Sequence, residues 1–204
     1  IGFVYFIFLA RFLGVEKFGI YTFTLSFIYN FVPVADFGIE KFVLRDVSRS
    51  PKKEGIYFSK LLPLRISFSL GAYLIAVFLG LFLGLSFDKI LYLMLFGLLL
   101  IPQNLLYFWI SFQNAKERMC FMALANVATI FLAAFLGTAF VLLNFPFIFL
   151  FTTFFLSNSL IMLIFFLKVS VRAQKSIFKI DLDFWLKAVA QSWPFAVFVI
   201  LAVY

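Results

Sequence analysis

Acidic side chains interrupt an otherwise apolar chain in the stretch ADFGIEKFVLRDVSRSPKKEG at residues 35–55. Asp36 and Glu40 are four residues apart, so in a helix they lie on the same side. If the segment crosses a membrane, these acids need a base as partner or a wet cavity. The bases in reach are Lys41, Arg45 and Arg65. Two interpretations stay open: a gate or staple of paired charges, or a site that couples H⁺ or Na⁺ or contacts a polar substrate.

A polar stripe precedes these acids in the apolar segment at residues 18–40. At 100 degrees per helical residue, its members share an arc of about 120 degrees. The members are Thr22, Ser26, Asn30, Pro33, Asp36 and Glu40. A charged side chain at depth is costly in lipid, so this face is expected to meet a bundle interior or a wet cavity.

A second polar arc, of about 100 degrees, lies in the segment at residues 90–113 and just beyond it. It holds Gln103, Asn104, Tyr107, Ser111 and Asn114, and a smaller face near Asn126 follows in the next segment. Pro33 and Pro102 each remove a helix hydrogen bond and are expected to kink their segments. The candidate pathway or gating residues are therefore Asn30, Asp36, Glu40, Arg45, Arg65, Gln103, Asn104, Tyr107 and Asn126. Any single Asn or Gln among them could instead serve only to hold two helices together by a side-chain hydrogen bond.

The composition of the chain indicates that these apolar segments lie in a membrane. Hydrophobic residues make up 65% of the chain, Phe alone occurs 34 times in 204 residues, and the mean hydropathy is +1.13. A soluble core of this size cannot bury so much apolar surface. The apolar runs are too long for barrel strands, and backbone satisfaction in lipid then predicts an all-α integral membrane protein.

Runs of about 20 apolar residues, the length that crosses a bilayer, mark the expected helices. Five are complete, at residues 18–40, 61–85, 90–113, 120–143 and 147–167, and partial runs occupy 1–13 and 193–204. Because both partial runs touch a chain end and residue 1 is Ile, we expect a window from a longer protein. We predict an N-terminal six-helix lobe at 1–168, a cytoplasmic linker with an amphipathic helix at 169–192, and the start of a second lobe at 193–204.

The basic residues predict the orientation. When the seven apolar runs, partial ones included, are numbered in chain order, 14 of the 17 Lys and Arg follow the even-numbered runs and so lie on one side of the membrane. Only Arg11, Lys17 and Lys89 lie on the other side. The positive-inside rule places the 14 in the cytoplasm, at the inner membrane of a prokaryote. The net charge of +8 is then explained mostly by the basic cytoplasmic loops that set the membrane topology. Because these charges are dispersed over three loops, they do not favour nucleic-acid binding. The amphipathic stretch 175–191 is expected to lie on the inner membrane surface.

Catalytic chemistry has little support in the sequence. The chain has no His, and its single cysteine, Cys120, excludes an internal disulfide and lacks partners for a metal. We therefore expect no enzyme activity, no cofactor and no metal site. A membrane-embedded glycan polymerase or transferase would need positioned acids, bases or a metal, and the outer loops are too short to build them.

Three segments resemble a known family: ARFLGVEKFGIYTF at 10–23, ADFGIEKFVLRDVSR at 35–49 and QSWPFAV at 191–197. They are similar to the flippases that move lipid-linked oligosaccharides in O-antigen and polysaccharide export, in the superfamily of the multidrug and toxin extrusion antiporters. The resemblance implies a MATE-like fold, with two lobes of about six helices around a central cavity, and alternating access.

The resemblance also implies a function and partners. The expected substrate is a polyprenyl-diphosphate-linked oligosaccharide, flipped across the membrane with coupling to an H⁺ or Na⁺ gradient. Membrane lipids and polysaccharide assembly proteins are the implied partners. Arg65 is the base best placed for an anionic diphosphate. A cation-coupled multidrug antiporter is the close alternative, although Asp36 and Glu40 near the inner surface favour it less.

Overall fold

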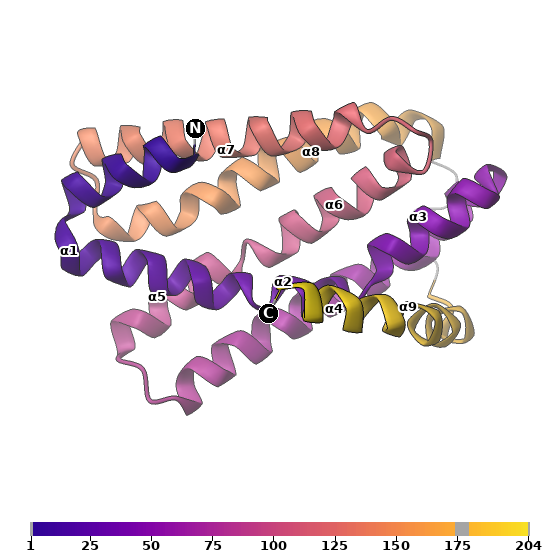
Figure 1. Cartoon of the computed structure of the whole chain (residues 1–204), viewed down its shortest axis with the longest axis horizontal. Helices are drawn as coiled ribbons and strands as arrows, with labels where there is room; N and C mark the ends of the chain where they lie inside the picture. The colour runs from indigo at the N-terminus through magenta and orange to yellow at the C-terminus, as the bar shows by residue number, and fades with distance from the viewer. Residues whose placement is uncertain (1, 174–179, 204) are drawn as a thin grey trace.

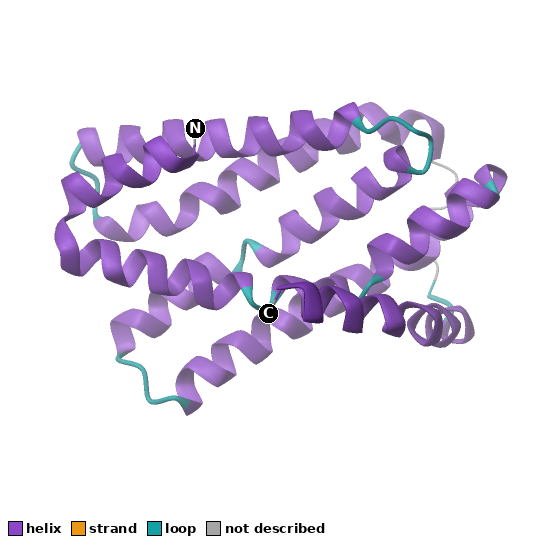
Figure 2. Cartoon of the chain, in the orientation of Figure 1, coloured by secondary structure: helices purple, strands orange, loops and turns teal. Residues whose placement is uncertain are grey.

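The computed structural model describes residues 2–173 and 180–203, and every regular element among them is a helix (Figures 1 and 2). In chain order these are α1 Gly2–Tyr29, α2 Val32–Asp36, α3 Ile39–Arg49, the 3-10 turn η1 Pro51–Lys53, α4 Glu54–Phe82, α5 Phe87–Gly97, α6 Leu100–Asn114, α7 Cys120–Leu142, the 3-10 turn η2 Phe147–Thr152, α8 Thr153–Ala173 and α9 Leu182–Val203. The predicted all-α class is confirmed for this part of the chain.

Among the described residues, four stretches are long and apolar enough to cross a membrane. They are Pro51–Phe82, Phe87–Asn114, Cys120–Leu142 and Phe147–Leu167. The last three agree closely with the predicted runs, and α7 reproduces the run at 120–143 to within one residue. The first begins about ten residues earlier than predicted, because η1 and the charged first turns of α4 join the helix.

The connections lie at two opposite ends of the bundle (Figure 1). The bend within α1 and the loops at 83–86 and 143–146 share one end, on the left of the view, and the connections at 50–53 and 115–119 share the other. Gly14 interrupts α1 with a φ of 73° and a ψ of 170°, a conformation that glycine adopts without strain. The chain therefore reverses at residue 14, where the sequence predicts an outer loop.

The predicted single helix at residues 18–40 is wrong. The segment breaks first after Tyr29 and again at Phe37–Gly38, so it forms the end of α1, then α2, then the start of α3. Pro33 explains the first break, because it cannot donate to the carbonyl of Tyr29 four residues earlier and its ring clashes there. The single polar arc fails with the helix: Ser26 and Asn30 are exposed, whereas Pro33 and Asp36 are buried.

The predicted run at 90–113 is also divided, into α5 and α6, at residues 98–99. Pro102 lies four residues after Leu98, so the same loss of a hydrogen bond applies. The two proline breaks lie next to each other in the middle of the bundle, since the rings of Tyr29 and Phe96 are 6.4 Å apart (Figure 2). α6 itself is continuous, so the second polar arc holds, with Gln103, Asn104 and Ser111 buried.

Two further differences concern the charged segments. α3 continues to Arg49 as an amphipathic helix that buries Ile39, Phe42, Val43 and Val47. Residues 174–179 of the predicted linker lie outside the described residues, and α9 runs without a break across residue 192. The apolar side of 184–189 packs against protein, because Trp185 and Ala188 belong to a core cluster with α3 and α4, and its position at the membrane surface stays a prediction.

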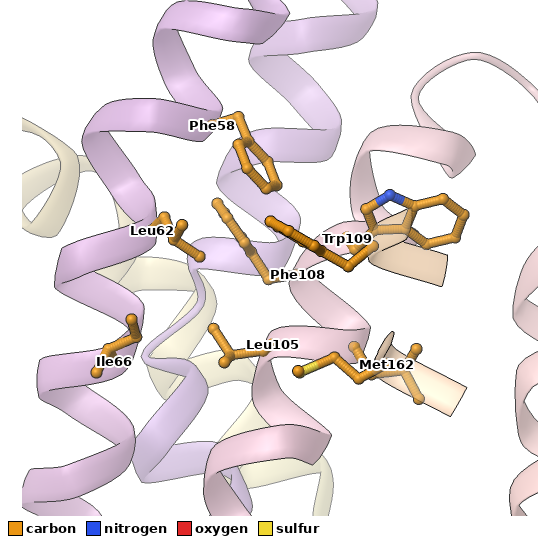
Figure 3. A pocket seen from close by; sticks show the side chains of 9 residues that line it. Phe58, Leu62, Ile66, Leu105, Phe108, Trp109 and Met162 are labelled. Carbon is orange, nitrogen blue, oxygen red and sulfur yellow. The ribbon is translucent and has the colours of Figure 1, made fainter. Parts of the chain in front are cut away.

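The helices α4, α6 and α8 leave an apolar pocket of about 220 Å³ between them (Figure 3). Its lining includes Phe58, Leu62 and Ile66 from α4, Leu105 and Phe108 from α6, and Met162 from α8. Phe108 also belongs to the core cluster around α3 and α4, so one ring separates this pocket from the buried polar residues beyond it.

Candidate functional site

Asp36 joins α2 to α3. Its Oδ2 accepts a hydrogen bond from the backbone N–H of Gly38 at 3.1 Å, and its Oδ1 accepts one from that of Glu40 at 3.2 Å. These donors belong to the first turn of α3, where backbone N–H groups lack helical partners and the helix dipole favours an anion. The second break of the segment is therefore closed by a carboxylate that the local backbone itself holds in place.

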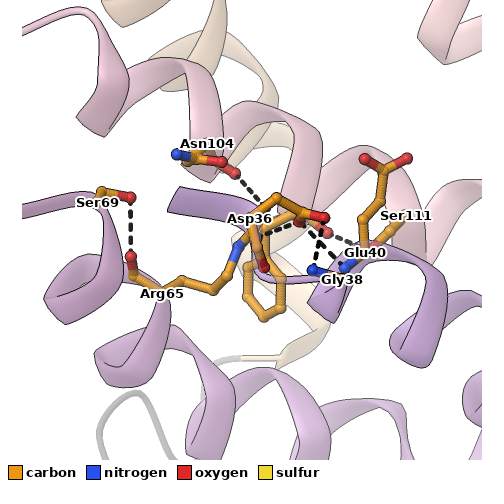
Figure 4. Close-up of polar contacts among 8 residues, drawn as sticks. Asp36, Gly38, Glu40, Arg65, Ser69, Asn104 and Ser111 are labelled. Atoms are coloured by element: carbon orange, nitrogen blue, oxygen red, sulfur yellow. Dashed lines mark hydrogen bonds and ion pairs between the residues drawn. The ribbon is translucent and has the colours of Figure 1, made fainter. Parts of the chain in front are cut away.

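Arg65 reaches this carboxylate from α4 and is fully buried (Figure 4). Its Nη1 donates to the backbone carbonyl of Asp36 at 2.9 Å and forms an ion pair with Asp36 Oδ1. Its Nη2 donates to the backbone carbonyl of Asn104 at 3.1 Å, and the guanidinium carbon lies 5.6 Å from the ring centroid of Phe108. One side chain thus ties α2, α4 and α6 together beside the proline breaks.

The charge pair is sensitive to the loss of either partner. Asp36 is only 9% exposed and Arg65 is 0% exposed, so water screens neither charge well. Removing one partner of such a pair typically costs about 3–5 kcal/mol, because the other charge stays buried and uncompensated.

Hydrogen-bonding capacity remains unused around the pair. Within the described residues, Arg65 Nε, Gln103 Oε1 and Asn104 Nδ2 are buried without a partner. Most buried polar atoms in proteins are paired, so the unpaired Nε of Arg65 and the unpaired amide of Asn104, whose carbonyl accepts from Arg65, call for an explanation. Both are donors, and this leaves the cluster able to bind an additional oxygen-rich group.

Glu40 does not join the pair. Its backbone N–H donates to Asp36, but its half-buried side chain points away from Arg65 on the α6 side, near Ser111 (Figure 4). Arg45 lies on the other side of α3: its Nε contacts Asp46 Oδ1 at 2.8 Å and its Nη2 donates to Gln191 Oε1 at 3.2 Å. Of the three bases in reach of Asp36, the structure selects Arg65.

The remaining predicted residues lie apart from the pair. The hydroxyl of Tyr107 donates to Asn126 Oδ1 at 2.9 Å and thereby links α6 to α7. Gln103 is buried next to Asn104 on α6. Asn30 is exposed, and its side-chain amide donates to the carbonyl of Ser26 at 2.8 Å within its own segment. Of the nine candidates, Asp36, Glu40, Arg65 and Asn104 are joined by hydrogen bonds and Gln103 adjoins Asn104 on α6. Tyr107 and Asn126 form a pair that links α6 to α7, and Asn30 and Arg45 are peripheral.

Sequence reasoning missed Gly38, the residue at the second break. It has a φ of 73°, and a Cβ there would meet the backbone oxygen of Ser192 at 2.5 Å and the backbone nitrogen of Ala196 at 2.7 Å. Only glycine fits both the left-handed backbone and this close approach of α9. The signal was available, because a glycine two residues after the acid marks a break in a helical pattern.

Sequence reasoning also missed the contacts that fasten the start of α9 to α4. Lys60 Nζ pairs with Asp181 Oδ2 at 2.7 Å, and the indole N–H of Trp185 donates to the backbone carbonyl of Lys60 at 2.7 Å. The hydrogen bond from Lys60 lowers the pKa of Asp181 below its ordinary value. No pattern in the sequence predicts this pairing, which joins residues more than a hundred positions apart.

Comparison with known proteins identifies the family. No curated protein and no solved structure matches the chain. A model of the family described as polysaccharide biosynthesis protein matches residues 1–203, which is nearly the whole chain. The helices that can cross a membrane agree with the resemblance to polysaccharide export proteins. The chain therefore belongs to the polysaccharide biosynthesis protein family.

Proposed function

We propose that this protein is a transporter that flips a polyprenyl-diphosphate-linked oligosaccharide across the cytoplasmic membrane by alternating access. One observation carries the proposal: a fully buried arginine, held by an acid at a helix break, lies between membrane-crossing helices. Charged groups inside a membrane bundle are costly and are typical of substrate or ion pathways. The family match supports the role in polysaccharide biosynthesis.

The proposed architecture is a six-helix lobe followed by the start of a second lobe, in a MATE-like arrangement. The turn at Gly14 separates the first helix from the second, and α9 begins the second lobe. The closing contact of α9 on Gly38 would then lie at the junction between the lobes. Transporters of this kind rock one lobe against the other around a site built from broken helices.

The proposed substrate carries the hydrogen-bond acceptors that the unpaired donors of the Arg65 cluster lack. A diphosphate offers several anionic oxygens, and guanidinium groups bind phosphate with paired, charge-assisted hydrogen bonds. Arg65 Nε and Asn104 Nδ2 are the buried donors without a partner that would receive such oxygens. In the structure the guanidinium of Arg65 forms an ion pair with Asp36, so the substrate and Asp36 would compete for the same cation.

This competition supplies the link between binding and movement. A ligand changes a conformational equilibrium only through its different affinity for the two states. A diphosphate that replaces Asp36 at Arg65 releases α2 from α4, because the ion pair and the hydrogen bond from Arg65 to the Asp36 carbonyl join these two helices. The proline breaks beside it provide positions where helices can change direction.

Export of labelled lipid-linked glycan in cells tests the proposal. Asp36→Asn and Arg65→Ala are expected to reduce export at least about tenfold at matched protein abundance, since each removes one partner of the charge pair. Asp88→Asn removes an exposed acid from the first turn of α5 and serves as the matched control, with export unchanged. Normal export by both pair variants would refute the proposal. Efflux of apolar cations in place of glycan export would instead favour the multidrug antiporter.

A further inference from the structure

The apolar pocket between α4, α6 and α8 belongs to three membrane-crossing stretches (Figure 3). Its lining consists of aliphatic side chains, aromatic rings and Met162. At membrane depth the surrounding solvent is hydrocarbon, and an apolar hollow of this kind has no reason to hold water. Its natural occupant is a flexible hydrocarbon chain, because a volume of about 220 Å³ is far too small for a helix.

The depth of the pocket can be measured from one end of the bundle. Lys116 Nζ and Glu54 Oε2 form an ion pair at 2.7 Å, which joins the end of α6 to the start of α4. Phe58 and Ile66, the first and last lining residues of α4, lie roughly 6 and 18 Å along the helix from Glu54, at about 1.5 Å per residue. The pocket thus occupies the leaflet next to this end, about half of a hydrocarbon core that is roughly 30 Å thick.

Basic side chains lie at this end of the bundle. Lys52 and Lys53 directly precede α4, Arg118 lies in the loop between α6 and α7, and all three are exposed. In the described part of the chain none of them forms an ion pair, whereas Lys116 and Lys60 do. Glu117 is the acid among them, so the surface keeps a positive surplus.

We propose that an anionic glycerophospholipid of this leaflet binds here, with one acyl chain in the pocket and its phosphate at Lys52, Lys53 and Arg118. Charge complementarity selects an anionic headgroup over a zwitterionic one, and basic clusters between helices at the positively charged side bind such lipids. The acyl chain packs against Phe108, whose ring also contacts Arg65. The site therefore touches the buried charge pair from outside without belonging to it.

Native mass spectrometry of the purified full chain, titrated with phosphatidylglycerol or phosphatidylcholine, tests the headgroup requirement. The variant K52Q/K53Q/R118Q is expected to bind phosphatidylglycerol about a hundredfold more weakly, since each cation near the surface contributes a factor of about five. The control R11Q/K17Q/K89Q removes three cations from the opposite end and is expected to change binding by less than about twofold.

A second pair of variants tests the pocket. Leu105→Trp adds bulk to a lining position and is expected to displace the bound lipid. Leu124→Trp makes the same change at a position on α7 that is 60% exposed, and it is expected to retain the lipid. Should Leu105→Trp fail to fold, the cation variants still decide the proposal.

Three results would overturn the proposal. The first is equal binding of phosphatidylcholine and phosphatidylglycerol, and the second is unchanged binding in the cation variant. The third is displacement of phosphatidylglycerol by polyprenyl phosphate at lower concentration, which would assign the pocket to the lipid tail of a transported substrate. Selective, cation-dependent binding of phosphatidylglycerol that polyprenyl phosphate does not displace supports it.

Discussion

Removing the charge of Asp36 is expected to destabilise the protein more than removing the charge of Arg65. Asp36→Asn leaves a fully buried guanidinium without its counter-charge. The predicted cost is about 3–5 kcal/mol, or roughly 10 °C in melting midpoint for a chain of this length. Arg65→Met leaves a carboxylate that keeps the N–H donors of Gly38 and Glu40. Its predicted cost is nearer 2 kcal/mol, about the penalty for an imperfectly satisfied buried polar group.

The double variant Asp36→Asn/Arg65→Met completes the cycle. Replacing both partners of a buried pair is often close to neutral, so the double variant is expected to be more stable than Asp36→Asn alone. Thermal unfolding in one detergent, followed by circular dichroism, measures all four proteins. A coupling of at least about 2 kcal/mol supports the reasoning, because contacting groups couple by about 0.5–3 kcal/mol. Additive effects of the two changes would refute it.

Three further predictions follow from neighbouring features. Gly38→Ala is expected to lower stability by about 2 kcal/mol or more, because the new Cβ would lie 2.5 Å from the backbone oxygen of Ser192 on a left-handed backbone. Gly55→Ala, where nothing lies within 4 Å of the new Cβ, is expected to be neutral or stabilising. Thermal unfolding of the two variants in parallel compares them. The Lys60–Asp181 contact contributes to stability at pH above the ordinary Asp pKa of 3.8, and this contribution is lost as pH falls through the lowered pKa of Asp181. The fluorescence of Trp185, measured in a Trp109→Phe/Trp193→Phe background, should therefore change below about pH 3.8. Lys60→Met should abolish that change. Pro33→Ala restores the missing hydrogen bond to Tyr29 and is expected to reduce glycan export several-fold without lowering the melting midpoint, and unchanged export would show that this break is not a hinge.

Periodicity and composition predicted the long, uniformly apolar helices well. α7 has no proline and no charged residue, so the run at 120–143 matches Cys120–Leu142. The polar arc of α6 was also predictable, because Pro102 lies in the first turn and leaves the later residues on one continuous helix. Both breaks lie four residues before a proline, where the hydrogen bond is lost, whereas α4 and α9 continue through Pro63 and Pro194.

The candidate site was predictable in its members but not in its pairing. Lys41, Arg45 and Arg65 were all in reach of Asp36 in the sequence, and only the packing of α4 against α2 selects Arg65. The single arc over residues 18–40 failed because it assumed one helix, although Gly38 permits a left-handed turn inside it. The docking of Trp185 on Lys60 depends on tertiary packing, which residue patterns do not encode.

Transport of the glycan itself tests the central claim most directly. The purified full chain is reconstituted into vesicles that carry a polyprenyl-diphosphate-linked oligosaccharide, and a membrane-impermeant glycosidase reports how much glycan reaches the outer leaflet. We predict rapid exposure with the native protein and exposure at the protein-free rate with the folded double variant Asp36→Asn/Arg65→Met. Equal exposure with both proteins, or none above the protein-free rate with the native protein, would contradict the account.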